Sequence, residues 1–174
     1  MEGQDTSGVP ANVLKLQEFI QTKDPVYTYL HNTPGISGAE KILKEGLLFE
    51  NHLSSTTDQV SQNDLVELNY FRMIRKSYGN VTIIIQISTK LVEDFSRRLR
   101  QTKFHFSEAL SKTRPVYNEN DYPVYILPEQ FIRGYLDHKT LQTKENPKFN
   151  PFFFPLYFED NLQRLLKQYG KNEN

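Results

Sequence analysis

Residues 81–87, which read Val-Thr-Ile-Ile-Ile-Gln-Ile, restrict the fold of this chain more than any other segment. The run is almost continuously apolar, and its β-branched side chains favour an extended backbone. A strand with apolar side chains on both faces is stable only when other elements cover both faces. The sequence therefore predicts a central strand here, with the rest of the chain packed on either side of it.

The remaining elements are predicted from the spacing of apolar residues and from the residues that cap or break helices. Ser37 and Glu40 match a capping box at a helix start, and Gly46 stands where that helix would end. Helices are expected over 10–20, 37–46, 63–78 and 88–99 and around 162–169, and further strands over 26–30, 47–49, 124–127 and 132–137. Loops or irregular segments are expected over 54–58 (alternatively an edge strand), 138–150 and 150–158, the last as an aromatic strap over the core.

Strands and helices mix here without a regular strand–helix–strand repeat, which is typical of the α+β class. A chain of 174 residues is long enough to bury one core without disulfides. We therefore expect a single domain over 1–174, with a flexible N-terminus over 1–9.

The charge and composition exclude several classes of function. The chain carries 21 basic and 21 acidic side chains, so no net field recruits nucleic acid or an anionic membrane surface. The absence of cysteine excludes disulfides, thiolate catalysis and cysteine-ligated metal sites. The first residues lack the pattern of a secretory signal, and the longest apolar run is far too short to span a bilayer. We therefore expect a cytoplasmic protein without a membrane partner.

Polar side chains with functional potential come after the strand predicted over 26–30. His31 follows this strand directly, and residues 54–57 form the hydroxyl-rich run Ser-Ser-Thr-Thr. An imidazole at a strand end can bond to a ribose or phosphate, or act as a general acid or base near neutral pH. The alternatives are a half-buried histidine that bonds to the backbone, and hydroxyl side chains that serve only in turns and caps.

Four carboxylates flank the later strands and are candidates for catalysis. Glu119 and Asp121 precede the strand predicted over 124–127, Glu129 follows it, and Asp137 lies farther on. A carboxylate at a strand start can be held toward a cleft while it stays accessible to solvent. Each of the four can instead be an ordinary solvated loop residue.

Two other sets of side chains carry weaker signals. The remaining histidines lack the spacing of metal ligands, so no metal is expected; they are His52, His105 and His138. Basic residues cluster near the end of the helix predicted over 88–99, as its exposed face or alternatively as a phosphate site; they are Arg97, Arg98, Arg100 and Lys103.

Taken together, the order of these segments resembles the ADP-ribosyltransferase-like fold, which includes poly(ADP-ribose) polymerases, diphtheria-type toxins and tRNA 2′-phosphotransferases. Members of its histidine–tyrosine–glutamate branch have a strand ending in His-Gly-Ser or His-Gly-Thr, then a helix with Ile-Leu and a following Gly-Leu. The segments that carry the resemblance are 30–33, 39–47, 55–58 and 120–127, within a core over 26–137. The resemblance implies a split, strongly bent pair of mainly antiparallel sheets, flanked by helices, that grips NAD⁺ in an extended pose.

The resemblance also implies roles for individual residues. His31 would bond to the adenosine-side ribose, and Thr33 would support the nicotinamide amide. Tyr70, or another ring nearby, would stack on nicotinamide. Asn32 stands where many members have glycine, and Ser55 and Thr56 occupy the place of the second-strand motif.

The catalytic acidic group implied by the resemblance is Asp121 or Glu119, with Glu129 as a further candidate. It would bond to the nicotinamide-side 2′-hydroxyl and stabilise an oxocarbenium-like centre. Asp121 is one methylene shorter than the family glutamate.

The expected function is an NAD⁺-dependent ADP-ribosyltransferase, or an NAD⁺ glycohydrolase, that acts without a metal on a macromolecular acceptor, as toxin-type members do. The alternative is a catalytically silent nucleotide-binding or protein-interaction module on the same fold. A hydrolase that pairs His31 with a carboxylate is a third possibility. Chemistry on a 2′-phosphorylated RNA end is disfavoured, because RNA handling usually requires a basic face.

Overall fold

The computed structural model describes residues 8–61, 80–99 and 106–169. Its helices are α1 (Ala11–Phe19), α2 (Ile36–Glu45), α5 (Thr89–Leu99), α6 (Phe106–Leu110) and α7 (Phe158–Tyr169), with 3₁₀ turns η1 (Leu53–Ser55) and η3 (Glu129–Phe131). Its strands are β1 (Val26–Thr33), β2 (Leu47–Glu50), β3 (Asp58–Val60), β4 (Val81–Ser88), β5 (Val116–Tyr117), β6 (Pro123–Leu127), β7 (Ile132–Asp137) and β8 (Thr143–Glu145). The helix expected over 63–78, which includes Tyr70, lies outside the described residues.

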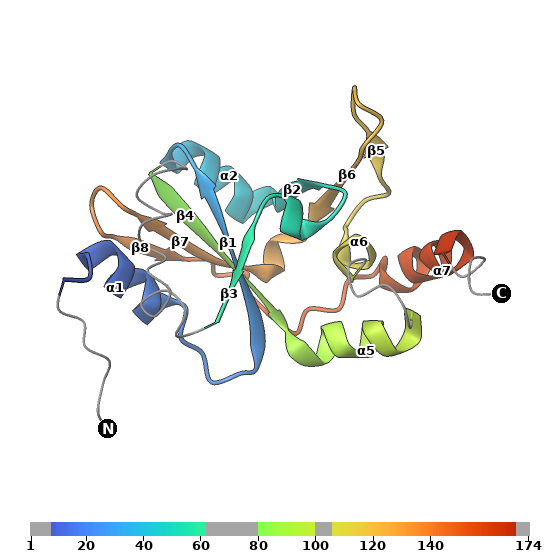
Figure 1. Ribbon diagram of the computed structural model, residues 1–174, viewed down its shortest axis with the longest axis horizontal. Coiled ribbons are helices and arrows are strands. Elements are labelled where there is room, and N and C mark those ends of the chain that lie inside the picture. The colour runs from blue at the N-terminus through green and yellow to red at the C-terminus, as the bar shows by residue number, and fades with distance from the viewer. Residues whose placement is uncertain (1–7, 62–79, 100–105, 170–174) are drawn as a thin grey trace.

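The larger sheet has five antiparallel strands in the order β3-β1-β4-β7-β8. Its middle strand is β4, and every residue of β4 is buried. The prediction of a central strand at this position is therefore confirmed. β1 pairs with β4 along its whole length, which sets Asn32 opposite Thr82. Figure 1 shows this sheet on the left of the molecule, with the smaller sheet and α5, α6 and α7 on the right.

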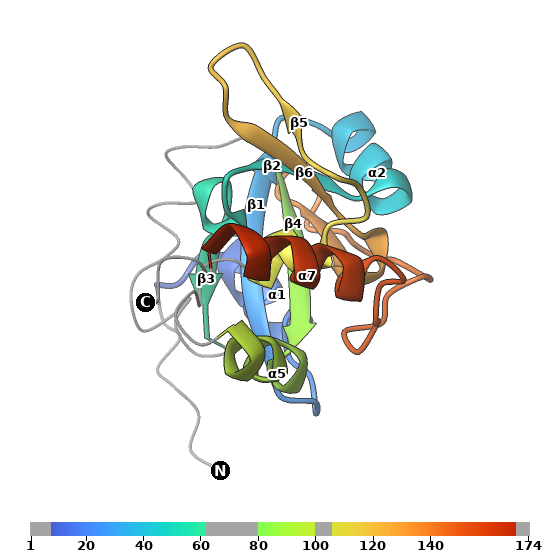
Figure 2. The same cartoon turned by 90° about the vertical axis from the view of Figure 1, so that its right-hand side faces the viewer.

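The smaller sheet has three antiparallel strands in the order β2-β6-β5. The α+β class with two antiparallel sheets is thus confirmed. Glu50, the last residue of β2, lies opposite Val124 near the start of β6. The β5–β6 hairpin projects beyond the rest of the molecule in both views (Figures 1 and 2).

Two hydrophobic clusters cover the two faces of the larger sheet. α1 packs Val13, Leu16 and Ile20 against Leu30 and Ile84 on one face. On the other face a larger cluster joins the odd-numbered isoleucines of β4 to α2, α6, α7 and the smaller sheet. Several of its contacts are between rings, such as the Phe49–Tyr125 stack with centroids 5.4 Å apart. Because both faces are covered, the polar side chains of β4 have partners inside the protein: Thr82 bonds to Asn32 and His138, and Gln86 donates to the carbonyl of Ile20.

Some expected boundaries are wrong. β1 runs to Thr33 rather than to residue 30, because its pairing with β4 continues to the Thr33–Val81 register position. α2 begins at Ile36, its N-cap is Gly35, and no side chain caps it, so the capping box of Ser37 does not form. The end of α2 at Gly46 is confirmed; its φ of 94° is a conformation that glycine adopts without strain.

Three short elements were not expected: α6, β5 and β8. α6 is a single buried turn in a segment without clear periodicity. β8 lies within the loop predicted over 138–150; it is an exposed edge strand that pairs with β7 and needs no apolar pattern of its own. No helix within the described residues combines the length and the apolar composition that crossing a membrane requires.

Candidate functional site

A polar pocket of about 340 Å³ opens at the end of β1, and we call it the His31 pocket. β3 pairs with β1 at Thr28, Tyr29 and Leu30, and this pairing stops before His31. The chain before β3 therefore diverges from β1 and leaves a hollow at the edge of the sheet. Residues 30–32 line one side of this hollow, and residues 54–58 line the other.

His31 is half-buried at this position and its ring is held by Thr56. Nδ1 lies 2.9 Å from the carbonyl oxygen of Thr56 and 3.2 Å from its hydroxyl oxygen. A carbonyl oxygen only accepts, so Nδ1 carries the proton in the neutral ring and donates it. Nε2 is then the unprotonated nitrogen, a hydrogen-bond acceptor in a pocket rich in hydroxyl groups.

The hydroxyl-rich run serves both of the roles considered for it. Thr57 is buried and its hydroxyl donates to the carbonyl of Leu53 at 2.9 Å, which is a turn-forming role. Backbone bonds from Ser55 to His52 and from Thr56 to Leu53 close the turn η1. The turn presents Ser55 and Thr56 to the His31 pocket, together with the carboxylate-bearing Asp58.

Asn32, which also lines the pocket, is fixed by a chain of hydrogen bonds that runs across the sheet. The buried hydroxyl of Thr82 donates to Oδ1 of Asn32 at 2.6 Å and lies 2.6 Å from Nε2 of His138. Nδ1 of His138 lies 3.0 Å from Nδ2 of Asn12 in α1. Because Thr82 has one proton to give, Nε2 of His138 must donate to Thr82, and Nδ1 must accept from Asn12.

This chain holds His138 in its neutral form. Burial lowers the pKa of His138, and the nearby charge of Asp137 opposes that effect only in part. In the charged ring, the second proton would be on Nδ1 and would face Nδ2 of Asn12. That amide nitrogen only donates hydrogen bonds, so it cannot accept this proton. The pattern of alternating strand residues could not have revealed these partners, because Asn32, Thr82 and His138 are far apart in sequence.

Of the residues with an expected role, His31, Asn32, Ser55 and Thr56 thus come together in one pocket. Thr33 is buried beside α2, where its hydroxyl lies 2.9 Å from the position that a Cβ on Gly38 would occupy. It is not among the residues that line the His31 pocket. Tyr70 falls in the part of the chain that is not described.

A second pocket of about 380 Å³, the Glu50 pocket, adjoins the first. It shares Ser55 and Thr56 with the His31 pocket, and its other lining residues include Glu50 and Val124. The start of β6 therefore lies one pocket away from His31. Glu50 was not singled out from the sequence, because nothing local marks this last residue of β2 as part of a pocket.

The expected acidic residues Glu119 and Asp121 lie in the exposed turn between β5 and β6. Asp121 has a φ of 60°, and its N–H donates to the carbonyl of Asn118. The side chain of Asn118 ties this turn to the end of β2, because its Nδ2 donates to Oε1 of Glu50 at 2.8 Å. The turn is therefore anchored beside the Glu50 pocket, but neither Glu119 nor Asp121 is among the lining residues of these two pockets.

Two other expected candidates have structural partners. Glu129 is buried and its carboxylate forms an ion pair with Lys112, at 2.8 Å. Asp137 accepts a hydrogen bond from the N–H of Lys139 in the turn after β7. In the basic cluster, Arg97 pairs with Asp94 on the same helix; the side chains of Arg98, Arg100 and Lys103 are not described.

Within the described residues, no three histidine or acidic side chains gather as a group that could hold a metal ion. Comparison of the chain with protein-family models, curated proteins and solved structures finds no match.

Proposed function

We propose that the chain binds NAD⁺ at the His31 pocket and breaks its nicotinamide–ribose bond, as an ADP-ribosyltransferase or an NAD⁺ glycohydrolase. One observation carries this proposal: the ring of His31 is fixed by Thr56 so that its Nε2 is an acceptor at the open end of β1. The two antiparallel sheets and the nearness of the start of β6 to this pocket also agree with the ADP-ribosyltransferase-like resemblance.

In this proposal His31 accepts a hydrogen bond from a ribose hydroxyl through Nε2, and the hydroxyl groups of Ser55 and Thr56 supply further contacts. As nicotinamide leaves, positive charge develops on the ribose ring, and a carboxylate nearby stabilises it. Two carboxylates are placed for this role: Asp58 lines the His31 pocket itself, and Glu50 lines the pocket that shares Ser55 and Thr56 with it. Glu119 and Asp121 remain candidates, since Asn118 holds their turn against Glu50.

The test is nicotinamide release from NAD⁺ by the purified protein and by four variants: His31→Ala, Asp58→Asn, Glu50→Gln and the double change Glu119→Gln with Asp121→Asn. Loss of one hydrogen bond to the ribose predicts about a tenfold lower rate for His31→Ala. Loss of the charge that stabilises the transition state predicts a fall of about 100-fold for the responsible carboxylate. Asp160→Asn is the matched control, because this exposed carboxylate pairs with Arg114 and lines none of these pockets.

The proposal fails if the wild-type protein releases no nicotinamide, or if His31→Ala and all the carboxylate variants match Asp160→Asn. A catalytically silent nucleotide-binding module is the second candidate. It is favoured by the position of Glu119 and Asp121, which face solvent on the projecting hairpin rather than the His31 pocket. A rise in melting temperature with NAD⁺ or ADP-ribose, without turnover, would support this second candidate.

A further inference from the structure

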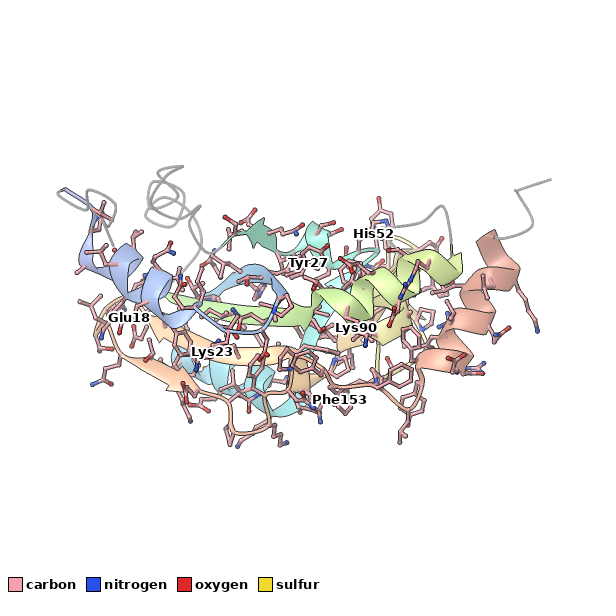
Figure 3. All side chains as sticks on the ribbon, turned by 90° about the horizontal axis from the view of Figure 1, so that it is seen from below. Glu18, Lys23, Tyr27, His52, Lys90 and Phe153 are labelled. Carbon is pink, nitrogen blue, oxygen red and sulfur yellow. The ribbon has the colours of Figure 1, made fainter. Side chains whose placement is uncertain are left out.

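A third pocket, the His52 pocket, lies on the other side of the turn η1 and has a volume of about 440 Å³. It borders the His31 pocket at Ser54, which lines both. Its walls come from β1, β3, η1, α5 and α6, so it is built from segments that are distant in sequence. Figure 3 shows Tyr27 and His52 on the same side of the molecule, beside α5.

The walls of the His52 pocket are mostly apolar and aromatic. Tyr27, Tyr29 and Phe106 contribute rings, and the rings of Tyr29 and Phe106 lie with centroids 6.2 Å apart. Burial raises the pKa of the Tyr29 phenol, so this wall is uncharged at neutral pH. These two rings pack against each other, and the surfaces that they and Tyr27 present to the pocket suit contact with a planar aromatic guest.

One polar pair stands among these rings. Nδ1 of His52 lies 3.2 Å from Oε1 of Glu108. The His52 side chain is 35% exposed and that of Glu108 only 3%, so the histidine covers a buried carboxylate. In the neutral ring, a carboxylate beside Nδ1 favours the proton on that nitrogen, which leaves Nε2 as the acceptor. The sequence does not predict the contact between His52 and Glu108, because 56 positions separate the two residues.

The charge of the described residues that line the His52 pocket favours a neutral guest over an anionic one. None of the described residues that line it is a lysine or an arginine, and Glu93 adds a carboxylate from α5. Among these described residues, a phosphate group would meet the carboxylate of Glu93 and no lysine or arginine. A neutral aromatic ligand that carries a hydrogen-bond donor could pack against the aromatic walls and donate to His52 at the same time.

We propose that the His52 pocket is the acceptor subsite of the transferase: it takes a neutral aromatic ring with an O–H or N–H group, and His52, backed by Glu108, receives the proton of that group. This inference rests on the proposed function. The acceptor oxygen or nitrogen forms a bond to the ribose carbon from which nicotinamide departs. Nicotinamide leaves as a neutral molecule with the electron pair of the broken bond, and the acceptor's proton passes to Nε2 of His52.

The ring can come from a phenol or from a nucleobase, and two pairs of matched compounds distinguish these sources. The first pair is N-acetyltyrosinamide and N-acetylphenylalaninamide, which differ by the hydroxyl. The second pair is uridine and 3-methyluridine, which differ by the ring N–H. Binding is measured by NMR titration of the full chain, with the amide signals of residues 52–54 and 107 as local reporters.

For the correct source, the compound with the donor binds about ten times more tightly than its partner, which is the effect of one hydrogen bond. His52→Phe keeps a ring at this position but removes the acceptor, so the tenfold difference disappears. Lys90→Ala is the control: Lys90 is exposed on α5, does not line the pocket, and its replacement leaves the difference intact. Equal binding within both pairs, signals that move only elsewhere, or insensitivity to His52→Phe would each overturn the proposal.

Addition of NAD⁺ separates this inference from the proposed function. Mass spectrometry is expected to detect the bound compound with one added ADP-ribosyl group. Nicotinamide release without that adduct would overturn the acceptor role and leave the NAD⁺-consuming function in place. Binding of the aromatic compound without any consumption of NAD⁺ would overturn the proposed function, and the acceptor role with it.

Discussion

The hydroxyl of Thr82 lies 2.6 Å from Nε2 of His138, and this contact joins α1 to the His31 pocket through Asn12 and Asn32. The geometry requires neutral His138, and burial lowers its pKa from the ordinary value of 6.5. Above pH 6.5 the ring is neutral in both the folded and the unfolded chain. As the pH falls below 6.5, the unfolded chain takes up the proton first, so the folded state loses stability.

We therefore predict that acidification below pH 6.5 lowers the free energy of unfolding of the wild type more than that of His138→Gln. Urea unfolding at pH 7.5 and at pH 5.5 measures this difference, and the comparison removes the contribution of groups that both proteins share, such as Asp137. An equal pH dependence in the two proteins would contradict the assignment of a neutral His138.

Thr82→Val keeps the size of the side chain but removes its hydroxyl. Oδ1 of Asn32 and Nε2 of His138 then lose their partner inside the sheet. We expect the free energy of unfolding to fall by about 1–3 kcal/mol, the usual result of leaving buried polar groups unpaired. Denaturant unfolding measures this loss, and Thr82→Ser, which restores the hydroxyl, is expected to recover most of it.

Gly46→Ala tests the junction between α2 and β2. Gly46 has a φ of 94°, and a Cβ on it would collide with the carbonyl oxygen of Leu127 in the partner strand β6. Strained backbone and steric overlap together predict a loss of at least about 2 kcal/mol. Gly35→Ala is the matched control, since a Cβ there meets nothing within 4 Å. Similar melting temperatures for the two variants would contradict this account.

Glu129→Gln tests whether this candidate carboxylate is structural. Lys112 donates to both carboxylate oxygens of Glu129 and also to the carbonyl of Glu45, so the pair joins α2 to the chain after α6. Because Lys112 is about one third exposed, we expect a modest loss of about 1 kcal/mol in the free energy of unfolding. Nicotinamide release measured below the melting temperature is expected to stay at the wild-type level; a large fall would assign Glu129 to catalysis instead.

The elements that could be predicted are those with long apolar patterns. β4 was predictable because the run over 81–87 is almost continuously apolar, and α1 because Val13, Leu16 and Ile20 recur at helical spacing. α6 and β8 could not be predicted, because one buried turn and three exposed edge residues are stabilised by their neighbours rather than by their own pattern.

The candidate site was predictable only on the β1 side. His31 and the hydroxyl-rich run are both strong local signals, and the divergence of β3 from β1 brings them to one pocket. The remaining polar contacts join residues that tertiary packing alone brings together, as with His52 and Glu108 or Asn118 and Glu50. Their spacing in the sequence has no period and matches no motif, so no local rule could have paired them.

The short turn η1 forms a wall that the His31 pocket shares with the His52 pocket. Ser54 faces both the His31 pocket and the His52 pocket, while Ser55 and Thr56 face both the His31 pocket and the Glu50 pocket. A shift of η1 that enlarges the His31 pocket would make the His52 pocket smaller. The larger the ligand in one pocket, the smaller the ligand that the other pocket can hold at the same time. A bulkier residue at Ser54 would narrow the His31 pocket and the His52 pocket together. This single substitution would therefore change which ligands each of the two pockets accepts.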